Sequence, residues 1–158
     1  MSSVFIDSNV IIRYFAGDTV AKSLLEPIFY GDVQGYINSI VFSEVIFVVI
    51  KLLTGRRAYE LKKNPEIVKD IFDKIMDYIR FLQQYFDELE INEEIKQLAS
   101  EIIKEHGLLP NDSLIAATCK HYSISTIATF DEDFKRVPWL KVVPLNLEGE
   151  IINQNYPP

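Results

Sequence analysis

The chain has 158 residues, of which 48% are hydrophobic and 25% are charged, a composition that excludes a disordered chain and predicts one folded domain. Its 16 Lys and Arg against 23 Asp and Glu give a net charge of −7, which excludes a uniformly basic surface for nucleic acid. The single cysteine, together with the lack of any apolar run near the ~20 residues of a membrane span, predicts a cytoplasmic protein.

The N-terminal part of the chain predicts strands that alternate with helices. We expect strands at residues 4–6 and 35–38, and helices at residues 8–15, 20–30 and 40–53. Pro27 is expected to kink or shorten the second helix, and Gly55 is expected to end the third.

The rest of the chain continues this alternation. Apolar residues with a 3.6-residue period predict one amphipathic helix over residues 65–85, which we interpret as facing the core rather than a partner protein. Further strands are expected at residues 86–91, 125–129 and 140–144, with helices at 92–106 and 111–122 and a turn at 131–136. This pattern predicts an α/β fold with a mostly parallel sheet in residues 1–150, followed by a loose tail at 151–158.

Acidic residues follow the ends of the predicted strands. In an open parallel sheet, ligands bind outside the carboxyl ends of the strands, where Asp7 and Asp131 are expected. Asp112 opens a predicted helix, whose dipole favours a negative charge there. Each acid also has a simpler explanation, because Asp7 and Asp112 could be helix N-caps, and Asp131 or Asp133 could fill a turn.

Glu44 has no such simple explanation. It lies within residues 40–50, which are otherwise apolar apart from Ser43, so its carboxylate is expected to be buried. A buried carboxylate must be protonated, paired with a base or bound to a cation, since an unpaired charge costs several kcal/mol. Pairing with a distant arginine is the structural alternative to a metal site.

Several carboxylates gathered at the strand ends would repel one another and raise one another's pKa values. A divalent cation removes that repulsion, and an all-oxygen ligand set favours Mg²⁺ or Mn²⁺ over Zn²⁺. His106 and His121 both fall at predicted helix C-termini, where the helix dipole explains them without a zinc site.

Four segments of the chain resemble the PIN-domain family, in particular its small toxin-like (VapC-type) ribonucleases. They are FIDSNVII at residues 5–12, SIVFSEVIF at 39–47, LLPNDSLIAAT at 108–118 and IATFDEDF at 127–134. Each segment alone is a weak signal, but together they occur in the family's order with an acid at each expected place.

The resemblance implies a Mg²⁺- or Mn²⁺-dependent endoribonuclease with a central parallel sheet of four or five strands flanked by helices. It further implies an RNA substrate, a homodimer and an antitoxin partner. The residues that it implies for catalysis and metal binding are Asp7, Glu44, Asp112 and Asp131, with Asp133 as a further metal ligand. The polar neighbours that it implies for orienting these acids are Ser8, Asn9, Ser43 and Thr129.

A basic segment offers a place for the substrate. Residues 51–63 carry five cations and one acid, Glu60. The residues that we predict to bind RNA are Lys51, Arg56, Arg57, Tyr59, Lys62 and Lys63, with the tyrosine stacking on an unpaired base. A solvated helix end followed by a loop would give the same charge pattern.

Two other functions are consistent with parts of the sequence. A haloacid-dehalogenase-like phosphatase also places an Asp after its first strand, but it needs a second Asp two residues later, where this chain has Asn9. A non-catalytic PIN-like module that binds RNA or protein would be expected to lack one or more of the acids, all of which are present here.

Overall fold

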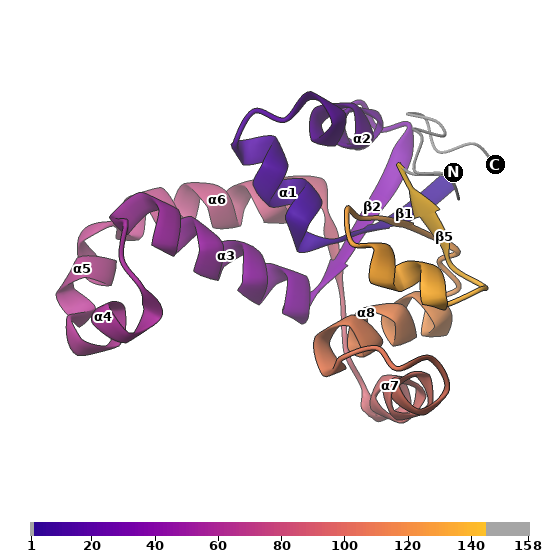
Figure 1. The fold of residues 1–158 in the computed structure, drawn as a ribbon. Helices are drawn as coiled ribbons and strands as arrows, with labels where there is room; N and C mark the ends of the chain where they lie inside the picture. Colours follow the sequence, from indigo (N-terminus) through magenta and orange to yellow (C-terminus); the bar gives the residue numbers. More distant parts are fainter. Residues whose placement is uncertain (1, 145–158) are drawn as a thin grey trace.

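The structure is a computed structural model that describes residues 2–144 (Figure 1), so the predicted domain end at residue 150 and the predicted tail at 151–158 lie outside the described residues. Its strands are β1 (Ser2–Ile6), β2 (Val33–Asn38), β3 (Asp87–Leu89), β4 (Thr126–Ala128) and β5 (Lys141–Val143). They form one five-stranded sheet in the order β3-β2-β1-β4-β5, and every pair is parallel. The predicted α/β fold with a parallel sheet is confirmed.

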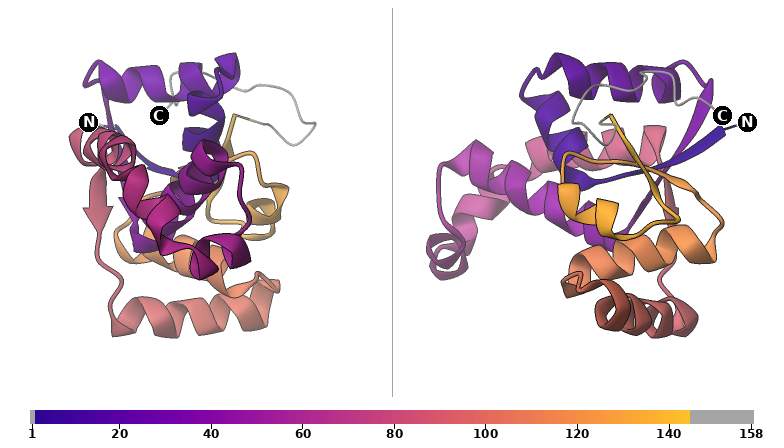
Figure 2. Two further views of the ribbon diagram at one scale, coloured as in Figure 1. Left: turned by 90° about the vertical axis from the view of Figure 1, so that its left-hand side faces the viewer. Right: turned by 45° about the vertical axis from the view of Figure 1, so that its right-hand side comes forward.

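Helices cover both faces of the sheet. They are α1 (Ser8–Phe15), α2 (Thr19–Phe29), α3 (Ser39–Thr54), α4 (Ala58–Lys63), α5 (Pro65–Asp70), α6 (Phe72–Tyr85), α7 (Glu93–His106) and α8 (Pro110–His121), with a short 3-10 helix, η1 (Glu132–Arg136). Helices α1 and α2 lie on one face, and α7 and α8 lie on the other (Figures 1 and 2). Among residues 2–144, no helix has both the length and the apolar character to cross a membrane.

Strand β1 lies in the middle of the sheet and is buried on both faces. Val4, Phe5 and Ile6 have no exposed surface, which explains why this strand is a continuous apolar run. Gly35 on β2 is required by close packing, because a Cβ atom there would lie 2.7 Å from Ile28 of α2. The first strand therefore ends at a fixed point inside the molecule, directly before Asp7.

The ends of several helices follow the sequence signals. Asn92 caps α7 by accepting a hydrogen bond from the backbone N–H of Ile95, and Asn38 caps α3 in the same way through Val41. Gly55 and Gly107 end α3 and α7 in the left-handed conformation. Helix α2 continues through Pro27 and ends two residues later at Phe29.

The arm, defined here as residues 47–80 of α3, α4, α5 and α6, projects from the body of the molecule (Figure 1). The prediction of one helix over residues 65–85 is wrong, because the backbone leaves helical geometry at Ile71 (φ −105°, ψ 13°) and separates α5 from α6. Helix α4, in the basic segment, was not predicted. The core-facing interpretation of this stretch is confirmed for α6, whose Ile75 and Leu82 are buried.

Aromatic rings join the base of the arm to the body. Phe81 of α6 lies 5.8 Å from Tyr14, 5.2 Å from Phe15 and 5.9 Å from Phe29, measured between ring centroids. Rings at these distances pack favourably beyond the apolar area that they bury. These contacts fix α6 against α1 and α2, and α3 packs against both α1 and α6. The far end of the arm extends away from the body (Figure 2).

Candidate metal site

Asp7 is the most deeply buried of the five acids. It follows β1, is 5% exposed, and accepts hydrogen bonds from the backbone N–H of Ser8 (2.8 Å) and the hydroxyl of Thr129 (2.7 Å). Burial raises the pKa of Asp7 to about 6, although these two hydrogen bonds oppose the shift. The N-cap explanation is therefore correct for one oxygen of Asp7, but the other points to the end of β4.

Thr129 and Asn9 join the ends of the two central strands. The Thr129 hydroxyl donates to Asp7 and accepts from the backbone N–H of Asp131 (2.9 Å). Asn9 donates from Nδ2 to the Thr129 hydroxyl (3.3 Å) and accepts from the backbone N–H of Phe130 (3.1 Å). Since β1 and β4 are neighbours at the point where the sheet order reverses, this network fixes Asp7 and Asp131 at the ligand-binding edge of the sheet.

Glu44 reaches the same edge from α3. Its carboxylate accepts a hydrogen bond from the Ser8 hydroxyl (3.3 Å), so Ser8 contacts two of the acids through its backbone and its side chain. Burial raises the pKa of Glu44, and the negative charge of Asp112 adds to the shift.

The expectation that the Glu44 carboxylate is enclosed is wrong. Glu44 is half-buried, because α3 leaves the body of the molecule and its apolar side chains at Phe47 and Leu52 are exposed. Among residues 2–144, no Lys, Arg or His forms an ion pair with Glu44, so the alternative of a distant arginine partner is not what the structure shows.

Asp112 lies in the first turn of α8, where Pro110 begins the helix and Leu109 occupies the cap position. It is therefore not the N-cap that the sequence allowed. Its pKa is raised to about 6 by burial, followed by the negative charges of Asp131, Asp7 and Asp133. The acids are thus close enough to affect one another's ionisation.

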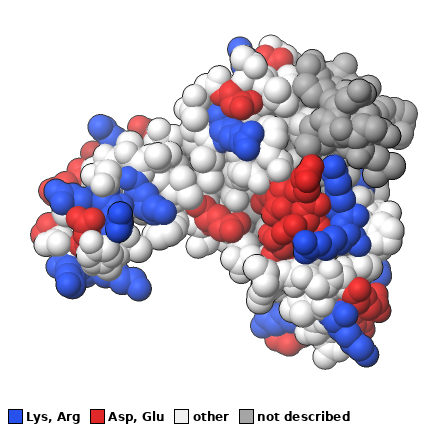
Figure 3. Space-filling view, viewed as in Figure 1, with Lys and Arg blue, Asp and Glu red and all other residues white. Residues whose placement is uncertain are grey.

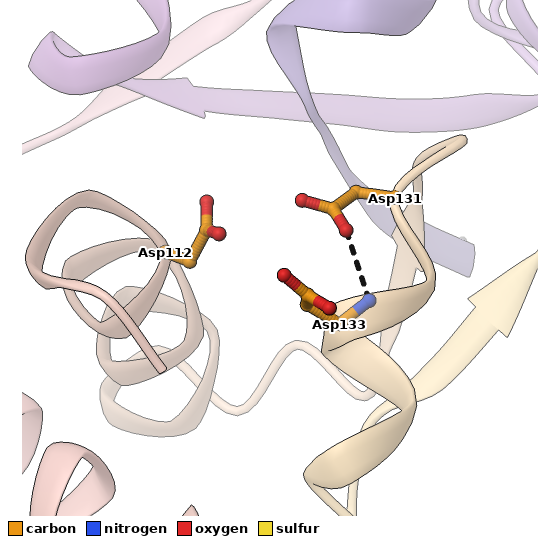
Figure 4. A group of neighbouring side chains, drawn as sticks. All are labelled: Asp112, Asp131 and Asp133. Carbon is orange, nitrogen blue, oxygen red and sulfur yellow. Dashed lines mark hydrogen bonds between the residues drawn. The ribbon is translucent and has the colours of Figure 1, made fainter. Parts of the chain in front are cut away.

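Three carboxylates meet in one place. Asp112, Asp131 and Asp133 each offer an oxygen, and these oxygens all lie within 4.8 Å of one another (Figure 4). Asp131 also caps η1, since its Oδ1 accepts from the backbone N–H of Asp133 at 2.9 Å. Asp133 is ion-paired with Arg136 (3.1 Å).

These residues fit a divalent cation. The five carboxylates supply only oxygen ligands, and among residues 2–144 the sole cation that pairs with any of them is Arg136. The pKa values of Asp7 and Asp112 are raised to about 6, which means that ionising these acids in the folded protein is unfavourable. A bound cation would offset this unfavourable free energy. Oxygen donors of this kind favour Mg²⁺ or Mn²⁺ over softer metals.

Comparison with known proteins agrees with this geometry. The PIN domain matches residues 4–140 of the chain. This chain belongs to the PIN-domain family. Ribonuclease VapC2 of Methanocaldococcus jannaschii is 42% identical over 144 residues, which cover 91% of this chain and 95% of that protein. Ribonuclease VapC6 of the same organism is 40% identical over 148 residues, which cover 90% and 97%.

Solved structures share the PIN fold. A toxin–antitoxin complex from Klebsiella pneumoniae has a TM-score of 0.62 and 23% identity, and the match covers 89% of this chain and 95% of that one. FitAcB from Neisseria gonorrhoeae has a TM-score of 0.59 and 24% identity, over 88% and 95% of the two chains. Membership of this family replaces the haloacid-dehalogenase-like alternative, and Asn9 is a hydrogen-bonding neighbour of Asp7 in this PIN domain.

The other predicted residues divide into two groups. Ser8, Asn9 and Thr129 contact the acids, whereas Ser43 is exposed and forms no hydrogen bond with any of them among residues 2–144. The basic segment lies at the end of the arm, away from the acids of the same chain (Figures 1 and 3). Its Arg56 pairs with Glu60 at 3.3 Å, and Tyr59 is 58% exposed.

Two neighbours of the acids were not predicted. Asn111 hydrogen-bonds to Glu44, and this bond opposes the larger rise that burial causes in the Glu44 pKa. Arg136 pairs with Asp133. Arg136 lies three residues after Asp133, a spacing so common on protein surfaces that it gives no signal by itself.

Proposed function

We propose that this PIN-domain protein is a metal-dependent endoribonuclease that acts in the cytoplasm, and that it is the toxin of a toxin–antitoxin pair. The observation that carries the proposal is the convergence of Asp112, Asp131 and Asp133 beside Asp7 and Glu44 at the edge of the sheet. Two relatives named as ribonucleases, matched over nearly their whole lengths, support RNA as the substrate.

The proposed ligands of Mg²⁺ or Mn²⁺ are the five acids Asp7, Glu44, Asp112, Asp131 and Asp133. When bound, such an ion activates water and neutralises charge on the scissile phosphate. Ser8, Asn9 and Thr129 keep the carboxylates oriented, because each donates to Asp7 or Glu44. Glu44 is half-buried with a raised pKa, so it serves either as a ligand or as the base that takes a proton from the attacking water.

The proposed substrate contact away from the acids is the basic segment of the arm. All of its cations are exposed, and Lys51 lies over the ring of Phe47 at 5.1 Å from the centroid. Exposed cations attract phosphate at a distance, and Tyr59 is free to stack on an unpaired base. This segment would guide RNA to the molecule without taking part in hydrolysis.

We further propose a homodimer and an antitoxin partner. The arm exposes large apolar side chains that the described residues do not cover, since Leu52 is 68% exposed and Phe72 is 58% exposed. Structural neighbours solved as toxin–antitoxin complexes support a protein partner. Sedimentation equilibrium tests the dimer: wild type should sediment as two chains and Leu52→Glu as one, and a monomeric wild type would contradict the proposal.

The function is tested by incubating purified protein with a pool of single-stranded and structured RNAs in Mg²⁺, Mn²⁺ or EDTA. The proposal expects internal cleavage that requires a divalent ion and that EDTA stops, because the acids without a cation repel the substrate. Calorimetry with Mn²⁺ on the same preparation measures the metal site independently. If the protein neither binds Mn²⁺ nor cuts any RNA, the proposal is overturned in favour of a non-catalytic RNA- or protein-binding module.

A further inference from the structure

The arginines of this chain differ in their partners. Three of the five are paired with a carboxylate three or four residues away in the chain, namely Arg56, Arg80 and Arg136. Arg13 and Arg57 form no ion pair with any residue among 2–144. Arg57 lies on the arm, whereas Arg13 lies on α1, the helix that follows Asp7.

Arg13 is held against an aromatic ring. Its guanidinium carbon lies 4.1 Å from the centre of the Phe130 ring, and the side chain is otherwise exposed. A guanidinium that rests its face on a ring keeps the N–H groups of its edge available. Those donors match the oxygens of a phosphate, which arginine can bind through two hydrogen bonds at once.

Phe130 places this cation at the border of the acidic site. The Phe130 ring contacts the Arg13 guanidinium, and the Phe130 backbone N–H donates a hydrogen bond to the side-chain oxygen of Asn9. The next residue in the chain is Asp131. Asn9 in turn donates to Asp7 and to Thr129. Arg13 is therefore tied through two contacts to the residues that orient the carboxylates, yet it forms no ion pair with any acid in the part of the chain described.

We propose that Arg13, seated on Phe130, binds a backbone phosphate of the RNA next to the bond that is hydrolysed. This proposal rests on the proposed function and names a substrate-positioning residue for it. The need for such a residue follows from charge: Asp112, Asp131 and Asp133 lie together, with Asp7 and Glu44 beside them. Among residues 2–144, the sole cation that pairs with any of these acids is Arg136. A cation at the border counters the repulsion between RNA and these acids without occupying their oxygens.

The simpler role for Arg13 is structural. It lies in the last turn of α1, where a positive charge interacts favourably with the helix dipole, and its contact with Phe130 stabilises the segment after β4. The two roles predict different results, because phosphate binding depends on salt, whereas a structural role changes the stability of the fold and the metal site.

The test measures binding of a labelled single-stranded RNA in Mn²⁺ over a series of salt concentrations, in an Asp112→Asn background that prevents hydrolysis. Adding Arg13→Ala should lower RNA affinity about tenfold and reduce the slope of log affinity against log salt by about 0.7, the value for one phosphate contact. Arg13→Lys should keep the slope and recover part of the affinity. Arg80→Ala, another exposed arginine, is the matched control and should change neither quantity.

Thermal unfolding and Mn²⁺ calorimetry on Arg13→Ala alone complete the test, and both should match wild type. An unchanged salt slope overturns the proposal, as does a loss of metal affinity or unfolding temperature without a change in slope. Cleavage is scored separately: a protein that binds RNA through Arg13 but never cuts it would refute the proposed function and leave only the contact between Arg13 and an RNA phosphate.

Discussion

The acidic site and the arm each contain many charged residues, but the two regions differ in how those residues are buried and paired. At the edge of the sheet, carboxylates from the end of β1, from α3, from α8 and from the start of η1 gather with one paired cation among residues 2–144, Arg136. The pKa values of Asp7 and Asp112 are raised to about 6. On the arm, the cations are exposed, and some pair with an acid three or four residues away in the chain, as Arg56 does with Glu60 and Arg80 with Asp77. Helix α3 belongs to both regions, with Glu44 at one and Lys51 at the other.

The difference teaches what each region can do. Carboxylates drawn together from distant parts of the chain raise the free energy of the folded protein, and a bound cation would offset that repulsion. Exposed pairs on the arm add little to stability and are screened by salt. The cations of the arm would therefore act on a charged partner mainly through their summed field, whereas hydrogen bonds hold individual carboxylates of the site in fixed positions.

The largest expected effect comes from removing one acid from the site. Asp112→Asn should lower the rate of RNA cleavage about 10²- to 10³-fold, since it removes a charge that faces three other carboxylates. Asp77→Asn, an exposed acid on the arm, should leave the rate unchanged. Single-turnover cleavage in Mn²⁺ measures the rates of both variants. Equal losses of rate in the two would contradict the proposed difference between the acidic site and the arm.

The next effect concerns stability and pH. The raised pKa of Asp7 means that the folded protein keeps a proton which the unfolded chain releases above pH 3.8. The protonated Asp7 side chain therefore contributes to the stability of the folded protein. That contribution is complete below pH 3.8 and is lost as the pH rises through about 6. In EDTA, Asp7→Asn should therefore gain stability relative to wild type between pH 4 and 7, by up to ~3 kcal/mol.

Urea unfolding of both proteins at several pH values, with and without Mn²⁺, measures this gain. Saturating Mn²⁺ should reverse the order at neutral pH, because the ion binds the ionised acids of the folded wild type. The comparison fails if the difference between the two proteins is independent of pH and of metal. Asp18→Asn, at the N-cap of α2, keeps an oxygen that can accept from the backbone N–H of Ala21, and it controls for replacing a cap aspartate by asparagine as such.

The smallest effect is expected on the arm. Arg56→Ala combined with Arg57→Ala should weaken RNA binding several-fold at low salt and flatten its salt dependence, with no change in Mn²⁺ affinity. Filter binding over a salt series measures this. An unchanged salt slope would show that the basic segment is only a solvated surface, and Glu60→Gln should act in the opposite direction by removing the single acid of the segment.

The sequence was sufficient for features that depend on neighbours along the chain. The sequence itself shows the residues that begin and end α7, the N-cap Asn92 and the C-cap Gly107. Asp7 and Asp131 follow apolar strands that are parallel neighbours, so the ends of these strands lie together. The same alternation predicted a mostly parallel sheet, and the resemblance to PIN domains implied four or five strands, of which the structure has five. The resemblance to PIN domains then selected Glu44 and Asp112, which local pattern alone left open.

Features that depend on packing were beyond the sequence. Apolar spacing continues across Ile71, because a one-residue break hardly changes the phase of the helical pattern, so two helices were predicted as one. The apolar residues around Glu44 suggested full burial, but only the fold shows that α3 leaves the body. The position of Arg13 over Phe130 joins residues 117 apart in the chain, and no local signal indicates it.

The position of β1 between β2 and β4 has a consequence for synthesis. Residues 126–128 must be made before β1 has its second neighbour, and Asp131 and Asp133 leave the ribosome last among the five acids. A growing chain that has exposed only Asp7 and Glu44 holds no complete acidic site. The three carboxylates that lie together, Asp112, Asp131 and Asp133, are therefore all present only when nearly the whole of the described domain has been translated.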